Sequence, residues 1–326
     1  MSDRLRWGIL STARINEALI APLRMSARNE LVAVASRSLE KAQDYAHTWK
    51  ITKAYGSYEE LLADTEVDVI YNSLPNHLHA EWTIRAAQAK KHVLCEKPMA
   101  LSTAELDAIK SAASENKVVI QEAFMYRHHP QTLKIQELVS SGAIGQLIQF
   151  VGTFTFVLKR PEDIRSKPEA GGGSIWDLGC YPISYARMIA NSQPNEVFGW
   201  RINMPSGVDE TFAGQIHFAN GMLAQISCSF GLPSYSSALI RGTEGSIFIP
   251  TPFKPEKPTS ITLQQGEKEK TLNFSSKNLY LGEVEDMADA ILNNKPTRVS
   301  LDDSRENVAT IAALLESAHL QRSVMV

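Results

Sequence analysis

The sequence has little excess charge and no basic run. Its 33 lysines and arginines nearly balance its 36 aspartates and glutamates, so that the formal net charge of the 326-residue chain is −3 at pH 7. Nucleic-acid-binding domains usually carry a basic patch or stripe on one face. The balance of charge therefore argues against a nucleic-acid partner.

Long apolar runs and paired cysteines are also missing. No segment reaches the roughly 18 apolar residues of a membrane-spanning helix, and the first residues, MSDRLRWGIL, lack a signal-peptide pattern. We therefore expect no membrane association. The only cysteines, Cys95, Cys180 and Cys228, are odd in number, widely spaced and in apolar contexts. This pattern predicts free buried thiols in a reducing compartment, and hence a cytoplasmic protein.

What the sequence does contain is a regular alternation over its first 120 residues. Strand patterns at 4–10, 30–36, 53–56, 67–74, 91–96 and 118–123 alternate with helix patterns at 13–25, 38–49, 57–64, 77–90 and 102–117. Ser102 and Glu105 form a capping-box pattern at the start of the last of these helices. The alternation predicts a parallel, doubly wound sheet covered by helices on both faces.

The pattern changes after about residue 125. One helix pattern is followed by candidate strands at 146–158, 195–203, 209–218, 221–230, 236–242, 245–249, 259–264 and 269–274, with a helix inserted at 174–190 and two closing helices at 280–293 and 303–320. Asn220-Gly221 predicts a two-residue hairpin turn. We therefore expect an α/β chain with a nucleotide-type domain at 1–124 and an α+β domain, with a mostly antiparallel sheet, at 125–326.

The dinucleotide fingerprint G-x-G-x-x-G has none of its glycines here. Its positions after the first strand fall on Ser11, Ala13 and Asn16. The fingerprint needs small residues so that the backbone can approach pyrophosphate at a helix N-terminus. Ser11 and Ala13 are small enough, whereas Asn16 is a looser fit. A plain strand-to-helix turn is the alternative.

The end of the second strand carries cations in place of the carboxylate that usually holds the ribose of NAD. The chain reads Ser36-Arg37-Ser38, with Lys41 one turn later. A hydroxyl and a guanidinium suit a 2′-phosphate, because arginine is a planar and permanently charged fork. The pattern favours NADP over NAD, with NAD possible. Solvated surface cations are the alternative.

Lysine and proline follow the buried strand that contains Cys95. Lys97 stands between Glu96 and Pro98, and a residue before proline is kept from helical backbone angles. The polar stretch SLPNHLH follows the neighbouring strand. Polar side chains therefore gather at one edge of the sheet, although a lone Glu-Lys-Pro is more often a surface turn.

Four segments together resemble the Gfo/Idh/MocA family, the glucose–fructose oxidoreductase and inositol dehydrogenase group. They are HVLCEKPMA (92–100), YGSYEELLAD (55–64), SLPNHLHAEWTIRAA (73–87) and EAGGGSIWDLGCYPISYARMI (169–189). Within this family the chain is similar to dihydrodiol dehydrogenases and bacterial sugar ketoreductases. The resemblance implies a Rossmann domain followed by an α+β domain whose large open sheet forms the interface of a homodimer or higher homo-oligomer.

The resemblance also implies the roles of individual residues. Catalytic roles fall to Lys97, Asp177 and Tyr181, which with Arg165 also bind the substrate. Cofactor contacts fall to Ser11, Thr12, Ala13, Arg14, Ile15, Ser36, Arg37, Lys41, Ser73, Leu74, Asn76, His77, Glu96, Lys97 and Arg127. No metal is expected, because His77 and His79 have H-x-H spacing without a carboxylate partner.

The spacing of Asp177 and Tyr181 places both on one face if residues 174–190 are helical throughout, although Pro182 must kink that helix or lie in its first turn. A phenol is a poor base near neutral pH unless a cation stabilises the phenolate. Lys97 supplies such a cation and would also polarise a carbonyl.

The function implied is hydride transfer between a nicotinamide and a carbonyl or alcohol carbon of a sugar-like or vicinal-diol substrate, a small molecule. The alternatives are a non-catalytic NAD(P)-sensing regulator and an NAD-assisted glycosidase on the same fold. Asp177 as a helix cap and Tyr181 as a half-buried aromatic remain the structural alternatives for those two residues.

Overall fold

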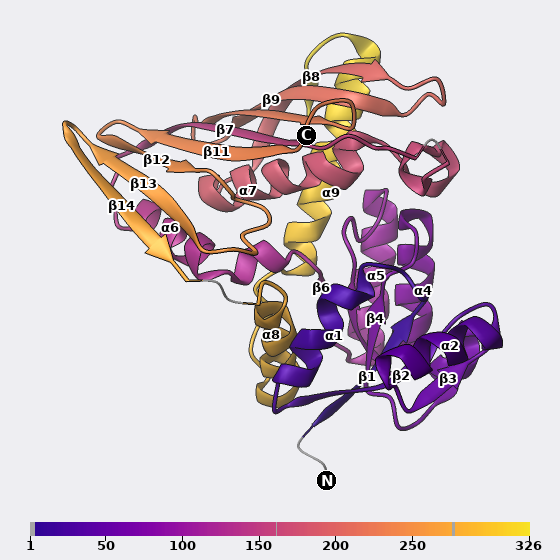
Figure 1. Ribbon diagram of the computed structural model, residues 1–326. Helices are drawn as coiled ribbons and strands as arrows, with labels where there is room; N and C mark the ends of the chain where they lie inside the picture. Colours follow the sequence, from indigo (N-terminus) through magenta and orange to yellow (C-terminus); the bar gives the residue numbers. More distant parts are fainter. Residues whose placement is uncertain (1–3, 161, 276–277) are drawn as a thin grey trace. The chain divides into compact units, whose positions relative to one another are not determined.

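The computed structural model describes residues 4–160, 162–275 and 278–326, which form two compact units (Figure 1). The first unit contains the chain up to Met125 together with Tyr280–Arg305, and the second contains Tyr126–Leu279 and Glu306–Val326. The sequence pattern predicts that Tyr280–Arg305 belong to the second domain. In the structure, α8 (Leu281–Asn293) joins the first unit, where Arg28 forms ion pairs with Glu285 and Asp289.

The first unit is built on a parallel six-stranded sheet, as predicted. Its strands are β1 (Leu5–Leu10), β2 (Asn29–Ala35), β3 (Lys53–Tyr55), β4 (Val69–Asn72), β5 (His92–Cys95) and β6 (Ile120–Glu122). Their order is β3-β2-β1-β4-β5-β6, and every pair is parallel. This is the order of dinucleotide-binding sheets. All four residues of β4 are buried, as expected for a central strand covered on both faces.

Helices connect the strands of the first unit. They are α1 (Asn16–Met25), α2 (Leu39–Trp49), α3 (Tyr58–Ala63), α4 (Asn76–Gln88) and α5 (Thr103–Asn116). The predicted cap of α5 is present, since the Ser102 side chain accepts a hydrogen bond from the Glu105 N–H. The Glu105 carboxylate, however, accepts from the N–H of Leu101 at 2.8 Å, one residue earlier than in a standard capping box.

The second unit is built on a nine-stranded sheet in the order β14-β13-β12-β11-β7-β10-β9-β8-β15. Its strands are β7 (Leu147–Thr155), β8 (Pro194–Asn203), β9 (Asp209–Phe218), β10 (Leu223–Ser229), β11 (Tyr235–Gly242), β12 (Gly245–Ile249), β13 (Thr259–Gln265), β14 (Lys268–Phe274) and β15 (Val324–Met325). Only the central pair β7–β10 is parallel. The predicted, mostly antiparallel sheet is confirmed.

The predicted hairpin joins β9 to β10, but not through a two-residue turn. The N–H of Gly221 donates to the carbonyl of Phe218, and the N–H of Phe218 donates to the carbonyl of Met222. Gly221 has a φ of 87°. These contacts describe a four-residue turn, Phe218–Gly221, that ends in a left-handed glycine, as in the longer type of hairpin loop.

The helices of the second unit are α6 (Pro130–Ser140), α7 (Cys180–Ala190) and most of α9 (Leu301–Leu320). Directly before α7, residues Ile175–Gly179 form a π-helical turn, η4. Pro182 lies in the first turn of α7 and has no N–H to donate, which is compatible with the wider turn that precedes it. A short 3₁₀ turn at Met125–His128 lies where the chain passes from the first unit to the second. Two more, at Ile164–Ser166 and Pro168–Ala170, lie in the segment that leads to η4.

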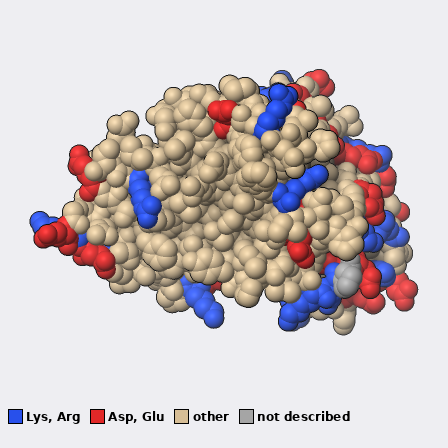
Figure 2. Space-filling model, turned by 90° about the horizontal axis from the view of Figure 1, so that it is seen from above, with Lys and Arg blue, Asp and Glu red and all other residues tan. Residues whose placement is uncertain are grey.

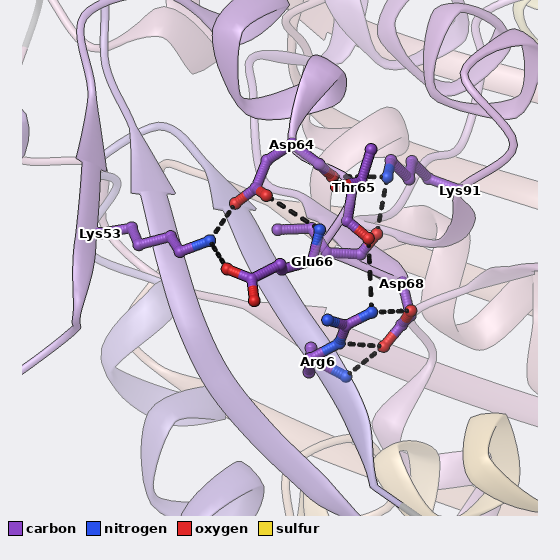
Figure 3. Close-up of polar contacts among 8 residues, drawn as sticks. Arg6, Lys53, Asp64, Thr65, Glu66, Asp68 and Lys91 are labelled. Carbon is purple, nitrogen blue, oxygen red and sulfur yellow. Dashed lines mark hydrogen bonds and ion pairs between the residues drawn. The ribbon is translucent and has the colours of Figure 1, made fainter. Parts of the chain in front are cut away.

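Ion pairs tie together the edge of the parallel sheet at which its strands begin (Figure 3). Lys53 contacts Asp64 at 2.8 Å and Glu66 at 2.5 Å, and Arg6 contacts Asp68 at 2.9 Å. The buried ammonium of Lys91 donates to the backbone carbonyls of Asp64 and Val67, each at 2.7 Å. This cluster is structural, since it lies at the edge opposite to the one where ligands of open parallel sheets bind.

We expect Asp64 to contribute acid-sensitive stability. Burial alone would raise the pKa of Asp64, but hydrogen bonds from Lys53, the Glu66 N–H and Tyr55 outweigh it and lower the pKa from 3.8 to about 2. Because the pKa is lower in the folded state, this stability is present above about pH 4 and lost as the pH falls towards 2. Asp64→Asn should cost about 1–2 kcal/mol at pH 7.

Calorimetry at pH 7 and at steps from pH 4 to pH 2 measures this contribution. The Tm difference between wild type and Asp64→Asn should shrink as the pH falls. Glu66→Gln is the matched control, because Glu66 also pairs with Lys53 but 64% of its side chain is exposed. A difference that is independent of pH would contradict the role given to Asp64.

Candidate functional site

The end of β1 and the end of β4 meet where the strand order of the parallel sheet reverses direction. Two serines join them: the hydroxyl oxygens of Ser11 and Ser73 lie 3.0 Å apart, and Ser73 Oγ donates to the carbonyl of Leu10 at 2.9 Å. In open α/β sheets the ligand crevice lies at this switch point. The structure therefore brings two residues predicted to bind the cofactor to the expected place.

Residues Ser11–Ile15 form the loop that leads from β1 into α1. Ser11 has a φ of 86°, in the left-handed region that glycine occupies at little cost. The serine is held there because its Oγ accepts the Ala13 N–H at 3.2 Å and its carbonyl accepts the Asn16 side-chain amide at 3.0 Å.

The conformation expected of the first fingerprint glycine is thus reached without glycine. Thr12, Ala13 and Ile15 are partly exposed and Arg14 is exposed, directly before the first turn of α1. Small, accessible residues before a helix N-terminus fit a dinucleotide pyrophosphate. Asn16, the loosest match to the fingerprint, is the residue that fastens this loop.

The end of β2 presents cations to solvent. The Ser36 side chain is buried and its Oγ accepts the Ser38 N–H at 3.4 Å, whereas Arg37 and Lys41 are exposed. Arg37 lies beside Tyr58: burial raises the pKa of that phenol, and the nearby guanidinium acts in the opposite direction. The residue in the position of the usual ribose-binding carboxylate is therefore an accessible arginine.

Two further loops follow β4 and β5. Ser73 and Leu74 are buried, Asn76 begins α4 and His77 is exposed on its first turn. After β5, Glu96 Oε1 accepts the Tyr71 hydroxyl at 2.5 Å and Glu96 Oε2 accepts the Lys97 N–H at 3.3 Å.

The Glu96 carboxylate therefore anchors the backbone on which Lys97 stands, and the Lys97–Pro98 peptide bond is cis. Burial, and then the Glu96 carboxylate, raise the pKa of Tyr71, so that its hydroxyl stays protonated and donates to Glu96. Tyr71 is a supporting residue that the sequence analysis did not identify, because it lies inside an apolar strand.

In the second unit, the predicted residues Arg165 and Asp177 lie in contact. Arg165 Nε donates to Asp177 Oδ2 at 2.8 Å, and the guanidinium also pairs with Asp163 at 3.2 Å. The Asp177 carboxylate, opposed by burial and aided by Asp163, raises the pKa of Arg165. Two residues twelve positions apart thus form one charged pair at the π-helical turn.

Tyr181 lies in the first turn of α7 and is 3% exposed. Its ring packs against Phe154, Phe253 and Tyr126, with centroid distances of 5.4, 5.9 and 5.9 Å. Arg127 is buried, and one of its guanidinium nitrogens donates to Ser184 on the same helix at 3.2 Å. An aromatic cluster therefore fixes the ring plane of Tyr181.

The turn that carries Asp177 is held by Asp209, a residue that the sequence analysis missed. Asp209 is 2% exposed, and its Oδ2 accepts the Ser174 hydroxyl at 2.6 Å and the Ile175 N–H at 2.7 Å. Gly173 has a φ of 120°, and a Cβ there would lie 2.3 Å from Asp209 Oδ1. The only sequence feature that could have indicated this role is an acidic residue at the first position of a strand pattern.

The predicted free thiols are confirmed, since Cys95, Cys180 and Cys228 are all buried and unpaired with one another. Among residues 4–160, 162–275 and 278–326, no three His, Cys, Asp or Glu side chains are grouped so that they could hold a metal ion. Within the same ranges, no helix is both long and apolar enough to cross a membrane.

Two protein-family models match the chain. The model described as "Oxidoreductase family, NAD-binding Rossmann fold" matches residues 5–124, and the model described as "GFO/IDH/MocA C-terminal domain" matches residues 132–248. An uncharacterised oxidoreductase of Rhizobium meliloti is 37% identical, with 97% of each chain covered.

Two relatives of stated activity match over nearly the full length. A D-xylose 1-dehydrogenase (NADP⁺) of Haloferax volcanii is 35% identical, covering 98% of this chain and 99% of the relative. A trans-1,2-dihydrobenzene-1,2-diol dehydrogenase of Danio rerio is 32% identical, with 98% of each covered. Among solved structures, a 3-ketoreductase of Actinomadura kijaniata in complex with NADP and TDP-benzene matches with a TM-score of 0.90 and 25% identity, over 96% of this chain and 98% of that one.

We expect Asp209→Ala to loosen the turn that carries Asp177. The substitution leaves the buried Ser174 hydroxyl and the Ile175 N–H without their acceptor, which should cost about 2–4 kcal/mol and lower the Tm. Asp209→Asn keeps one acceptor oxygen and should lose less. Scanning calorimetry measures the effect, with Glu196→Ala as an exposed control on β8. An Asp209→Ala protein as stable as the control would refute the anchoring role.

Proposed function

This chain belongs to the GFO/IDH/MocA family of NAD(P)-dependent oxidoreductases, and on that basis we propose that it uses NADP(H) to interconvert a carbonyl and an alcohol on a sugar-like or vicinal-diol substrate. The relatives named for D-xylose and for a dihydrobenzene diol support this substrate class, because both compounds carry hydroxyls on adjacent carbons.

The observation that carries the choice of cofactor is the exposed Arg37 at the carboxyl end of β2. A carboxylate at this position accepts hydrogen bonds from the ribose hydroxyls of NAD, whereas a guanidinium forms charge-assisted bonds with a 2′-phosphate. Lys41, one turn into α2 and also exposed, adds a second positive charge. The H. volcanii relative is named for NADP⁺.

The remaining proposed contacts follow from the loops of the first unit. The backbone of Ser11–Ile15 and the first turn of α1 would hold the pyrophosphate, next to Ser73 at the switch point. Ser36 would lie beside the ribose with Arg37. Leu74, Asn76, His77 and Glu96 would line the nicotinamide half, and Arg127 is proposed as a further cofactor contact.

The chemistry is divided between hydride and proton. Bound NADP(H) would supply or accept the hydride. Lys97, fixed through its backbone by Glu96, would place its ammonium at the substrate oxygen and stabilise negative charge there. The Tyr181 hydroxyl would pass the proton, helped by the cation, because a phenol needs such a charge to act near neutral pH.

Asp177 and Arg165 would bind the hydroxyl neighbouring the reacting carbon. Their 2.8 Å ion pair orients the carboxylate and leaves the guanidinium, whose side chain is 42% exposed, able to donate further hydrogen bonds. A carboxylate next to a guanidinium offers both acceptors and donors. This combination suits a vicinal diol, in which each hydroxyl both donates and accepts.

We also propose that the chain forms a homodimer through the outer face of the nine-stranded sheet. In strand register, one row across this face runs through the uncharged residues Phe198, Gln215, Gln225, Val151, Leu239 and Phe248. Trp200 and Leu223 on the same face are 61% and 53% exposed.

Figure 2 shows a broad uncharged area in the middle of this view, with charged side chains around it. Exposed large apolar side chains within an uncharged area, here Trp200, Leu223 and Phe248, are typical of an interface. A second copy is the proposed occupant, because a twofold interface uses the same surface on both copies and this uncharged face brings no like charges together. We further propose a cytoplasmic location, since three free thiols persist in a reducing compartment.

The first test is cofactor binding by fluorescence titration. Wild type should bind NADPH more tightly than NADH. Arg37→Ala should raise the Kd for NADPH about 10–100-fold, the equivalent of about 1.5–3 kcal/mol for a hydrogen bond to a charged group, and change the Kd for NADH little. Arg85→Ala removes the same charge from the far end of α4 and serves as the control.

Lys97→Met completes this test, because it should keep NADPH binding and abolish turnover when D-xylose, ketoses, deoxy-keto sugars and dihydrodiols are screened. NADH binding that is tight and independent of Arg37 would remove the NADP preference and leave the oxidoreductase assignment. Failure of the wild type to bind either cofactor would overturn the proposed function.

The dimer is tested by the mass in solution. Light scattering should give twice the chain mass of 36.1 kDa for wild type and a mass close to 36.1 kDa for Trp200→Glu/Phe248→Glu, since two buried charges oppose association. Leu292→Glu, an exposed apolar residue on α8, is the matched control and should remain dimeric. A monomeric wild type would exclude the interface.

A further inference from the structure

His79 is a buried residue between two of the loops described above. It lies on α4 and is 1% exposed, whereas His77, two residues earlier, is exposed. Its Nδ1 lies 2.7 Å from the carbonyl oxygen of Pro98, and its Nε2 lies 2.6 Å from the carbonyl oxygen of Leu74. One imidazole ring therefore touches the backbone after β4 and the backbone after β5.

Further hydrogen bonds fix the position of this ring. The Asn72 side-chain amide donates to the backbone carbonyl of His79 at 3.0 Å and to Thr83 Oγ1 at 3.1 Å, and Asn72 Oδ1 accepts the Leu74 N–H at 3.3 Å. Asn72 is itself 0% exposed, at the end of β4. The helix that carries His79 and the loop that contains Leu74 are thus locked to one strand end.

The ring fills the space between the two carbonyl oxygens and donates at least one N–H. Burial lowers the pKa of His79 to about 4; the carbonyls of Pro98 and Leu74 oppose this shift, and the charges of Lys97 and His77 add to it. Because both carbonyls only accept, a neutral ring donates to one of them and turns a lone pair towards the other, whereas the protonated ring donates to both. In either state the ring lies between the two loops.

We infer that His79 is a positioning residue that sets the separation of the Leu74 loop from the Lys97–Pro98 turn. The inference rests on the proposed function, in which Leu74 borders the cofactor and Lys97 acts at the substrate oxygen. The Leu74 contact then governs cofactor affinity, and the Pro98 contact governs the placement of the Lys97 ammonium. A displacement of either loop by about 1 Å is enough to change such a site.

The two contacts can be separated by substitution. An asparagine amide nitrogen reaches approximately the position of Nδ1 and a glutamine amide nitrogen that of Nε2, so that His79→Asn retains the Pro98 contact and His79→Gln retains the Leu74 contact. His79→Ala removes both. The readouts are the Kd for NADPH and the rate of acetylation of Lys97 relative to exposed Lys90, measured by competitive acetylation with acetic anhydride and peptide mass spectrometry.

We expect His79→Ala to raise the Kd for NADPH about tenfold, the equivalent of one buried hydrogen bond, and to raise the relative acetylation of Lys97 several-fold. His79→Gln should restore the Kd alone, and His79→Asn should restore the reactivity of Lys97 alone. Leu106→Ala, a core deletion on α5, controls for stability: it should lower the Tm and leave both readouts unchanged.

Two results would overturn the inference. One is a set of His79 variants within twofold of wild type in both readouts, and the other is a loss in all three variants that Leu106→Ala reproduces, which would indicate a merely structural role. If wild type itself does not bind NADPH, the proposed function fails, whereas the acetylation ratio of Lys97 still reports whether His79 holds the turn.

Discussion

The pairing of β1 with both β2 and β4 determines the position of every candidate cofactor residue in the first unit. Because all six strands are parallel, their carboxyl ends lie at one edge of the sheet. The strand order reverses between β1 and β4, and there the hydroxyl groups of Ser11 and Ser73 are in contact. Arg37 and Lys97 extend the same edge, one after β2 and one after β5. In the sequence these residues are spread from Ser11 to Lys97, and the strand register brings them to one edge.

Buried polar groups, rather than glycine, hold the loops of this edge. Ser11 keeps a left-handed backbone through its own hydroxyl and the Asn16 amide, and Tyr71 holds the Glu96 carboxylate against the Lys97 N–H. Each anchor is a donor matched to an acceptor in a part-buried position.

In the second unit, glycines in the sheet allow two helices to pack closely on it. Gly152, Gly199 and Gly214 lie on the inner face of its sheet, where an added Cβ would approach Pro182 or Leu314 to less than 3.0 Å. Bare backbone at these points lets α7 and α9 pack closely on the strands, and α7 carries Tyr181. Among the residues that the structure describes, no helix covers the outer face (Figure 1), and the uncharged row on this face is the reason for expecting a second copy there.

Apolar periodicity and turn residues are local properties of each segment, and they were sufficient to predict the fold class. The strands of both sheets except β15, Ser102 as a cap and the loop positions of Ser11, Arg37 and Lys97 were predictable on this basis. β15 has only two residues, too few for a strand pattern. The assignment of Arg165 and Asp177 to a site came from the family resemblance, and their 2.8 Å contact was not foreseen.

Tertiary structure alone decided which distant residues support the site. Asp209, at the start of β9, accepts a hydrogen bond from the turn that carries Asp177. His79, on α4, contacts the loops that follow β4 and β5. It also placed α8 in the first unit through the ion pairs of Arg28 with Glu285 and Asp289. These contacts join residues 5 to 261 positions apart, and no periodicity or spacing encodes a partner that only folding brings within hydrogen-bond distance.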